Sequence, residues 1–247
     1  MSVPRKIRCQ VESVTDHGGR VYTVDLAPSG PVPAFQPGQF LHLTVEPYDP
    51  SSFWPESRVF SIASSPRDRR RLRICYAVKG RYTTRMEQTL KPGIEVWTKL
   101  PFGDFVIDAA DDAVLLAGGT GISAFTAFLE ALAPDSPRHV TLVYGARAPE
   151  LLLFKEEILD RLARVPRFRT LWFTESGAFL PAGAVAALPN APRWFAGPIS
   201  LDCIWPQLAT PAANVFYLSG PPAMLAALSA GLAARGVPPA QIRADAW

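Results

Sequence analysis

The sequence predicts an antiparallel β-barrel domain followed by an α/β domain with a parallel, Rossmann-like sheet. Short segments of alternating apolar and polar residues, separated by turn residues, run from Lys6 to about Ile107, and this spacing is typical of a closed antiparallel barrel. Near residue 109 the pattern changes to apolar strands that alternate with helices, which indicates a parallel sheet. We therefore expect two domains, at residues 1–108 and 109–247.

The composition and charge of the chain exclude several functional classes. Of its 247 residues, 48% are hydrophobic and 19% are charged, as in an ordinary globular protein. The net charge of +3 is too small to argue for nucleic acid, and the longest apolar run, Ala113–Ala117, is too short to span a bilayer. Cys9, Cys75 and Cys203 are isolated, so they predict neither an iron–sulfur cluster nor a zinc site. Because no signal peptide is visible, we expect a soluble cytoplasmic protein without metal or membrane.

The strands of the first domain are each bounded by turn residues. Gly18-Gly19 marks a hairpin between the first two strands, and a short helix is expected from Thr83 to Leu90, ended by Lys91-Pro92-Gly93. The expected strand segments are 7–11, 21–26, 40–45, 58–66, 71–78 and 93–97.

The stretch from Arg58 to Pro66 combines a cation, an aromatic ring and a hydroxyl group on one strand. Phe60 can stack on a planar ligand, Arg58 can donate two hydrogen bonds to a phosphate, and Ser61 can reach a heteroatom at the ring edge. A half-exposed strand with a salt bridge would give the same pattern. The stretch therefore predicts a site for an apolar planar ligand with a phosphate tail only in combination with motifs later in the chain.

Two further features of the first domain allow two interpretations each. Gly80 to Thr83 opens the short helix, where free backbone N–H groups bind phosphate, although a threonine there could simply cap the helix. The five arginines between Arg67 and Arg73 form either a solvated hairpin tip or a docking patch for an acidic protein.

The second domain begins with a strand, a glycine-rich turn and a helix. Gly118-Gly119-Thr120-Gly121 joins the strand at 113–117 to a helix expected at 122–132, so a pyrophosphate could approach the backbone there. Further strands are expected at 140–144, 170–174 and 215–218. Pro149 is expected to open a helix that runs to about Arg164, and Gly236 to end the last helix. Residues 181–213 give no clear pattern.

Taken in order, these motifs resemble the ferredoxin–NADP reductase family of flavoproteins across nearly the whole chain. The family's R-x-[YF]-S, G-x-x-[ST] and P-F-G-x-F motifs match Arg58 to Ser61, Gly80 to Thr83 and Pro101 to Phe105. Its nucleotide turn matches Gly118 to Gly121, its C-G-P-x-x-M motif matches Ser219 to Met224, and its acidic-x-aromatic ending matches Asp245 and Trp247.

The resemblance implies an FAD-dependent enzyme that oxidises NADH or NADPH. It implies that Phe60 stacks on the isoalloxazine ring, that Ser61 lies near its N5, and that Arg58 and Thr83 hold the FAD phosphates. The residues expected to act in catalysis are Ser61, Ser219, Asp245 and Trp247. Those expected to contact FAD or the nicotinamide nucleotide are Arg58, Val59, Phe60, Ser61, Val78, Gly80, Tyr82, Thr83, Gly118, Gly119, Thr120, Gly121, Arg147, Glu175, Gly220, Pro221, Met224 and Trp247.

Three residues depart from the usual pattern. Ser219 stands where many relatives carry Cys beside the nicotinamide, and Ala124 stands where Pro often opens the helix. Phe60 lacks the usual tyrosine hydroxyl, which makes the stretch similar to that of the flavin-reductase branch. Ser219 is expected to slow or retune hydride transfer and Ala124 to reduce preorganisation of the helix start slightly, and neither removes the nucleotide site.

The expected function is electron transfer from a nicotinamide nucleotide, through flavin, to a separate acceptor such as a ferredoxin, a flavodoxin or an oxygenase component. A reductase that uses free flavin as its substrate is the first alternative, and a non-catalytic electron-transfer or nucleotide-sensing subunit is the second. NADH is the expected nucleotide because Glu175 would repel a 2′-phosphate but could bind ribose hydroxyls. Arg147 favours NADPH instead. The sequence leaves the acceptor open.

Overall fold

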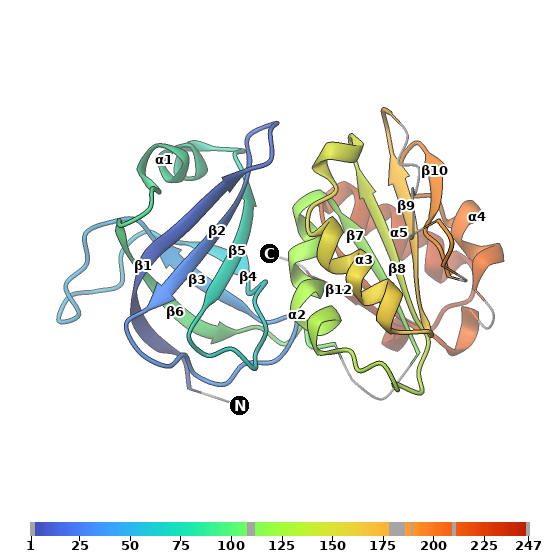
Figure 1. The fold of residues 1–247 in the computed structure, drawn as a ribbon, viewed down its shortest axis with the longest axis horizontal. Helices are drawn as coiled ribbons and strands as arrows, with labels where there is room; N and C mark the ends of the chain where they lie inside the picture. The colour runs from blue at the N-terminus through green and yellow to red at the C-terminus, as the bar shows by residue number, and fades with distance from the viewer. Residues whose placement is uncertain (1–2, 108–111, 178–185, 189, 209–210, 246–247) are drawn as a thin grey trace. The chain divides into compact units, whose positions relative to one another are not determined.

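The computed structural model divides the chain into two compact units (Figure 1). The first contains residues 1–106 and 126–128, and the second contains 107–125 and 129–247. The structure describes residues 3–107, 112–177, 186–188, 190–208 and 211–245.

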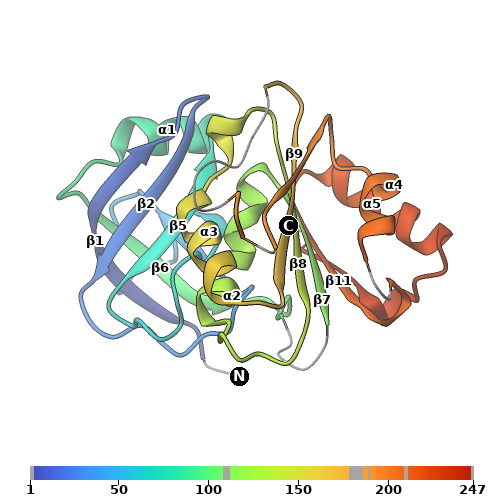
Figure 2. The ribbon, with the colours of Figure 1, turned by 45° about the vertical axis from the view of Figure 1, so that its right-hand side comes forward.

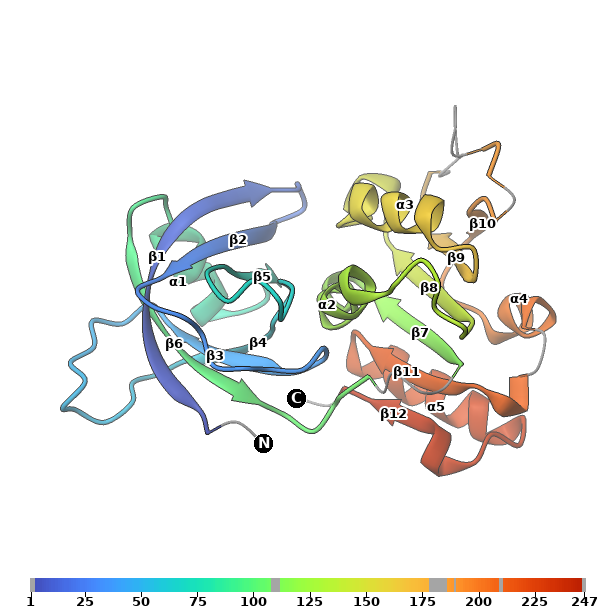
Figure 3. The same cartoon turned by 60° about the horizontal axis from the view of Figure 1, so that its bottom comes forward.

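The first unit is a six-stranded antiparallel sheet in the order β4-β3-β6-β1-β2-β5. The sheet curls round its own core into a barrel-like wall (Figure 3), which confirms the predicted antiparallel barrel. Its strands are β1 (Arg5–Asp16), β2 (Val21–Pro28), β3 (Phe40–Thr44), β4 (Arg58–Ser61), β5 (Leu72–Ala77) and β6 (Glu95–Phe102).

The alternation of apolar and polar residues explains why this sheet forms. Along β1, Cys9 and Val11 are buried while Arg8 and Gln10 are exposed, because successive side chains of a strand point to opposite faces. The hairpin between β1 and β2 turns at Gly18 and Gly19 as predicted, with φ of 80° and 58°, a conformation that glycine adopts without steric cost.

The short helix α1 (Arg81–Thr89) packs Tyr82 and Met86 into the barrel core. It begins two residues before the predicted start, because Gly80, with φ of −160°, acts as its N-cap. This end of the helix is important for the site described below.

The second unit is a six-stranded parallel sheet in the order β10-β9-β8-β7-β11-β12. Every residue of its central strand β7 is buried, as expected for a parallel sheet that is covered on both faces. The predicted α/β architecture is confirmed. The strands are β7 (Ala113–Gly118), β8 (Val140–Ala146), β9 (Phe168–Thr174), β10 (Arg193–Ala196), β11 (Val215–Ser219) and β12 (Ile242–Ala244).

Helices lie on both faces of the parallel sheet. Figure 2 shows α3 on one face and α4 and α5 on the other, where Leu201, Leu228 and Leu232 pack against the apolar strand residues. No helix in the described part of the chain is long and apolar enough to cross a membrane. The helices are α2 (Ser123–Ala131), α3 (Lys155–Arg164), α4 (Leu201–Ile204) and α5 (Pro222–Ala234).

Apart from shifted element ends and the short strand β12, which was not predicted, the structure departs from the predicted elements in two segments. The helix expected from Pro149 is a 3₁₀ turn at Pro149–Leu151, and α3 starts only after Phe154, whose φ is +54°. Within 181–213, which gave no clear pattern, β10 adds an edge strand.

Candidate functional site

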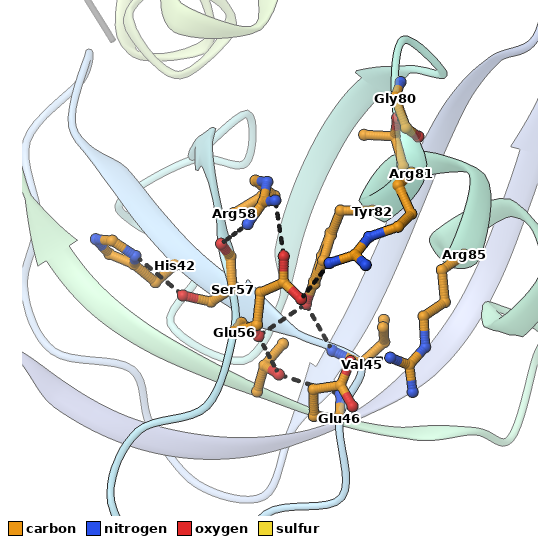
Figure 4. Close-up of polar contacts among 12 residues, drawn as sticks. His42, Val45, Glu46, Glu56, Ser57, Arg58, Gly80, Arg81, Tyr82 and Arg85 are labelled. Atoms are coloured by element: carbon orange, nitrogen blue, oxygen red, sulfur yellow. Dashed lines mark hydrogen bonds and ion pairs between the residues drawn. The ribbon is translucent and has the colours of Figure 1, made fainter.

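The guanidinium group of Arg58 lies at the start of β4 and is held from two sides (Figure 4). Its Cζ lies 4.5 Å from the centre of the Tyr82 ring, a distance at which a cation is attracted to an aromatic face. Its two terminal nitrogens donate to the Ser57 carbonyl and to the Glu56 carboxylate, each at 2.8 Å. The guanidinium is therefore oriented, yet its side chain remains 47% exposed.

Tyr82 supports Arg58 from within the core. Tyr82 is 4% exposed, and its hydroxyl accepts a hydrogen bond from the Val45 N–H and donates to the Glu56 carbonyl, both at 3.1 Å. The tyrosine is thus fixed at both ends, and only the ring face under Arg58 contributes to the candidate site.

The first turn of α1 lies close to Arg58 (Figure 4). The Thr83 hydroxyl accepts hydrogen bonds from the Lys79 and Gly80 N–H groups, at 2.9 and 3.1 Å, so the capping role that the sequence allowed is present. Gly80 has no side chain with which to cap the following N–H groups. The first N–H groups of a helix have no partner within it, so this turn retains donors for an anion.

The aromatic and hydroxyl groups predicted to meet a planar ligand follow Arg58 on β4. Phe60 is half-buried, with its ring centre 6.2 Å from that of Tyr76. Ser61 is 8% exposed, and within the described residues its hydroxyl has no hydrogen-bond partner. Val59 and Val78 are half-buried beside them. An oriented cation, a helix start, an aromatic ring and a hydroxyl therefore occur in one unit, which fits a planar ligand with a phosphate tail.

In the second unit, the glycine turn after β7 packs directly on the turn after β11. A Cβ atom on Gly121 would lie 2.3 Å from the Ser219 carbonyl oxygen, and one on Gly118 would lie 2.5 Å from the Met224 sulfur. A Cβ on Gly220, whose φ is +153°, would lie 3.0 Å from Gly118 Cα. Two motifs about a hundred residues apart thus meet with backbone contact that requires glycine. Pro221 belongs to the same contact, because its Cδ would lie 2.9 Å from a Cβ atom on Gly118.

The glycine turn itself is a 3₁₀ segment, Gly119–Ile122, which leads into α2. Gly119 has φ of +54° and open space around its Cβ position, and Thr120 is half-buried. Ser123 donates to the Thr120 carbonyl at 2.8 Å. The turn lies where a strand of the parallel sheet enters a helix, which is where such sheets bind nucleotides.

Ser219 and Asp245 meet at the ends of neighbouring strands. The Ser219 Oγ donates to Asp245 Oδ2 at 2.9 Å, and both residues are buried. The structure thereby joins two of the predicted catalytic residues. Trp247, a third, lies outside the described residues.

Arg147 and Glu175 follow the adjacent strands β8 and β9, and both are exposed. The two loops are tied together, because the Ser176 N–H donates to the Arg147 carbonyl at 2.9 Å. The structure therefore places a cation and a carboxylate at the same edge of the sheet.

The arginine run from Arg67 to Arg73 is partly structural. Arg73 forms an ion pair with Asp25 at 2.7 Å, and Arg69 donates to the Val32 carbonyl at 2.7 Å. These two guanidinium groups tie the segment to β2 and to the loop at Val32, so fewer arginines remain for a docking patch than the sequence suggested.

Sequence reasoning missed Glu56 and Arg81. Glu56 accepts from Arg58 and lies 3.7 Å from Arg81, so both residues belong to the candidate phosphate site. Glu56 lies two residues before Arg58 and Arg81 one residue after Gly80, so their closeness to predicted site residues was the signal in the sequence that could have found them.

Comparison with known proteins gives one family match and many relatives. The oxidoreductase NAD-binding domain family matches residues 115–179. A flavohemoprotein of Deinococcus radiodurans is 28% identical over 205 residues, 81% of this chain and 48% of the relative. The toluate 1,2-dioxygenase electron transfer component of Pseudomonas putida is 29% identical over 213 residues, 84% of this chain and 57% of the relative. The chain thus spans about half the length of these curated relatives.

Among solved structures, the flavohem-like FAD/NAD binding domain of nitric oxide dioxygenase from Vibrio cholerae has a TM-score of 0.78 and 22% sequence identity. The match covers 98% of each chain. At this identity the likeness concerns the fold, and it includes both the barrel-like sheet and the parallel sheet. Residues 115–179 of the second unit match the oxidoreductase NAD-binding domain family, and the fold of both units is similar to that of ferredoxin reductase-like FAD- and NAD-binding proteins.

Proposed function

We propose that this protein is an FAD-dependent NAD(P)H oxidoreductase that passes electrons to a separate acceptor. The observation that carries the proposal is the convergence of Arg58, stacked 4.5 Å from the Tyr82 ring centre, with the first turn of α1, whose N-cap residue Gly80 has no side chain to occupy the first N–H groups. Bound FAD accepts hydride from a nicotinamide nucleotide and releases the electrons singly or in pairs. FAD fits this donor set, because its pyrophosphate needs a cation and N–H donors.

The candidate-site residues of the first unit each have a role in this proposal. Arg58 and the first turn of α1, which Thr83 caps, bind the phosphates. Phe60 packs against the isoalloxazine ring, and Ser61 offers its hydroxyl to the ring edge. We propose residues 1–108 as the FAD-binding domain and residues 109–247 as the nucleotide-binding domain.

The second unit binds and orients the nicotinamide nucleotide. Gly118 to Gly121 and the turn at Gly220 let phosphate and nicotinamide groups approach the backbone. The buried pair of Ser219 and Asp245 lines the nicotinamide position.

The acceptor is a separate protein. Support comes from the relative whose name describes it as the electron transfer component of a dioxygenase. Exposed arginines at the hairpin tip, among them Arg67 and Arg70, provide charge for an acidic partner.

The purified protein tests the proposal directly. We expect a yellow protein with one FAD per chain, bleached by NADH or NADPH under anaerobic conditions. Arg58→Ala should weaken FAD binding at least several-fold, since a charge-assisted hydrogen bond contributes about 1.5–3 kcal/mol. Arg8→Ala is the control, because Arg8 forms an exposed ion pair with Glu95 on the same sheet.

Three outcomes contradict the proposal in different ways. Colourless protein that takes up no FAD removes the flavin site. Tightly bound FAD that neither NADH nor NADPH reduces favours a non-catalytic subunit. Flavin that is turned over as a free substrate, with no acceptor protein needed, favours a flavin reductase.

A further inference from the structure

Glu56 neutralises the cations on which the phosphate site depends. Its Oε1 accepts from Arg58 at 2.8 Å, and its Oε2 lies 3.7 Å from Arg81. Figure 4 shows the carboxylate between the two guanidinium groups, facing the first turn of α1. One carboxylate therefore occupies the position from which both cations would contact a phosphate.

Glu56 occupies one side of the Arg58 guanidinium group. One terminal nitrogen donates to the Ser57 carbonyl and the other to Glu56, and each of them keeps a second N–H. A phosphate that approaches from the side of Glu56 would therefore compete with this carboxylate for the same nitrogen.

The carboxylate of Glu56 is free to move, although its backbone is fixed. The Glu56 carbonyl accepts from the Thr44 hydroxyl at 2.8 Å and from the Tyr82 hydroxyl at 3.1 Å. The side chain is 40% exposed and that of Arg81 is 91% exposed. Tyr82 keeps Arg58 in place whichever anion is bound to it, so exchange of carboxylate for phosphate requires only side-chain rotation.

We propose that Glu56 competes with the flavin phosphates for Arg58 and Arg81 and thereby lowers the affinity for phosphorylated flavins; this inference rests on the proposed function. Arg81 is the second phosphate cation. A phosphate displaces the carboxylate from Arg58, and the displaced carboxylate then repels the bound phosphate. Both effects weaken binding, and neither acts on a flavin without phosphate.

The experiment compares flavin dissociation constants, measured by fluorescence titration of the full chain freed of flavin. Glu56→Gln should bind FAD and FMN about three- to tenfold more tightly than the wild type, the range that exposed ion pairs and one removed charge allow. Riboflavin affinity should stay unchanged. Arg81→Gln should weaken FAD and FMN binding about two- to fivefold, again without an effect on riboflavin.

Glu46→Gln is the matched control. Glu46 forms an ion pair with Arg85, one turn further along α1, so the variant removes one carboxylate charge that is paired with the same helix without touching Arg58 or Arg81. We expect its flavin affinities to equal those of the wild type. Glu56→Ala is the second variant, and circular dichroism melting verifies that each protein is folded.

The outcomes separate this inference from the proposed function. If wild-type protein binds no FAD, the proposed function fails. If it binds FAD but folded Glu56→Gln and Glu56→Ala bind it no more tightly, the competitor role of Glu56 is wrong while the FAD site stands. If Glu46→Gln tightens FAD binding as much as Glu56→Gln does, the effect comes from net charge and the inference is wrong. If Glu56→Gln also tightens riboflavin binding, the effect comes from packing around the ring, and the inference is again wrong.

Discussion

The Ser219 hydroxyl donates a hydrogen bond to Asp245 across neighbouring strands, with 2.9 Å between Oγ and Oδ2. Ser219 ends β11, and the Asp245 N–H donates in turn to the Leu218 carbonyl at 2.8 Å. The two residues are 4% and 3% exposed. A buried carboxyl group held in this way has a fixed orientation, because both its backbone and its side chain are bonded to β11.

Ser219→Ala tests the role of this pair. Removal of a donor from a buried carboxylate should lower the free energy of unfolding by about 1.5–3 kcal/mol. If the pair lines the nicotinamide position, the rate at which NADH bleaches the flavin should also fall. Ser13→Ala is the control, since Ser13 donates to Asp25 at 3.1 Å in the other unit. Equal bleaching rates in all three proteins would place Ser219 outside the nicotinamide site.

Gly121→Ala tests the contact between the turns that follow β7 and β11 in the second unit. In Gly121→Ala the new Cβ would lie 2.3 Å from the Ser219 carbonyl oxygen, so backbone must move. We expect a loss of about 1–3 kcal/mol in unfolding free energy, as for other overpacked sites, together with weaker nucleotide binding. Urea unfolding and isothermal titration with NADH measure the two effects.

Gly30→Ala is the control for Gly121→Ala. Gly30 has no atom within 4 Å of its Cβ position and no left-handed φ. Its substitution should change the unfolding free energy by less than about 0.5 kcal/mol. Wild-type behaviour of Gly121→Ala would contradict the close contact between the turns.

The sequence predicted the parts of the fold that have a local signal. Alternation along β1 and the apolar run of β7 report burial directly, and the order of the motifs predicted the two kinds of domain that the structure shows. The strand β10 has no such signal, because it is a four-residue edge strand within a Pro- and Ala-rich stretch, and none of its residues is fully buried. Phe154 interrupts a helical pattern through its left-handed backbone, which residue spacing does not reveal.

In the candidate site, too, some residues have a local sequence signal and others do not. Arg58 and Gly80 lie in recognisable motifs, whereas the pairing of Glu56 with Arg58 and Arg81 depends on how the loop before β4 meets α1. The pairing of Ser219 with Asp245 likewise depends on β12 joining β11. Such contacts come from tertiary structure and have no sequence pattern of their own.

The three thiols should differ sharply in reactivity. Burial raises the pKa of Cys9 to about 11 and that of Cys75 to about 12, so few thiolates form near pH 8. Cys203 is half-exposed. Native protein at pH 8 should therefore release one equivalent of thionitrobenzoate quickly from Ellman's reagent, and denatured protein should release three. Cys203→Ser should abolish the fast phase, and a fast phase that survives this substitution would contradict the burial of Cys9 and Cys75.

Arg147 and Glu175 oppose each other in the choice of nucleotide, and the carboxylate should prevail for the wild type. Both are exposed at the same edge of the sheet, where Glu175 would repel a 2′-phosphate and accept hydrogen bonds from a ribose. We expect a higher kcat/KM for NADH than for NADPH. Glu175→Gln should raise kcat/KM for NADPH about fivefold, since the repulsion between two charges near 4 Å in water is about 1 kcal/mol.

Arg147→Ala supplies the reciprocal measurement. It should lower kcat/KM for NADPH and leave that for NADH nearly unchanged, because only the 2′-phosphate distinguishes the two nucleotides. Glu12→Gln, an exposed carboxylate of β1, controls for net charge. A strong wild-type preference for NADPH that Arg147→Ala abolishes would mean that the arginine dominates, since a direct contact between cation and phosphate would then exceed the repulsion from Glu175.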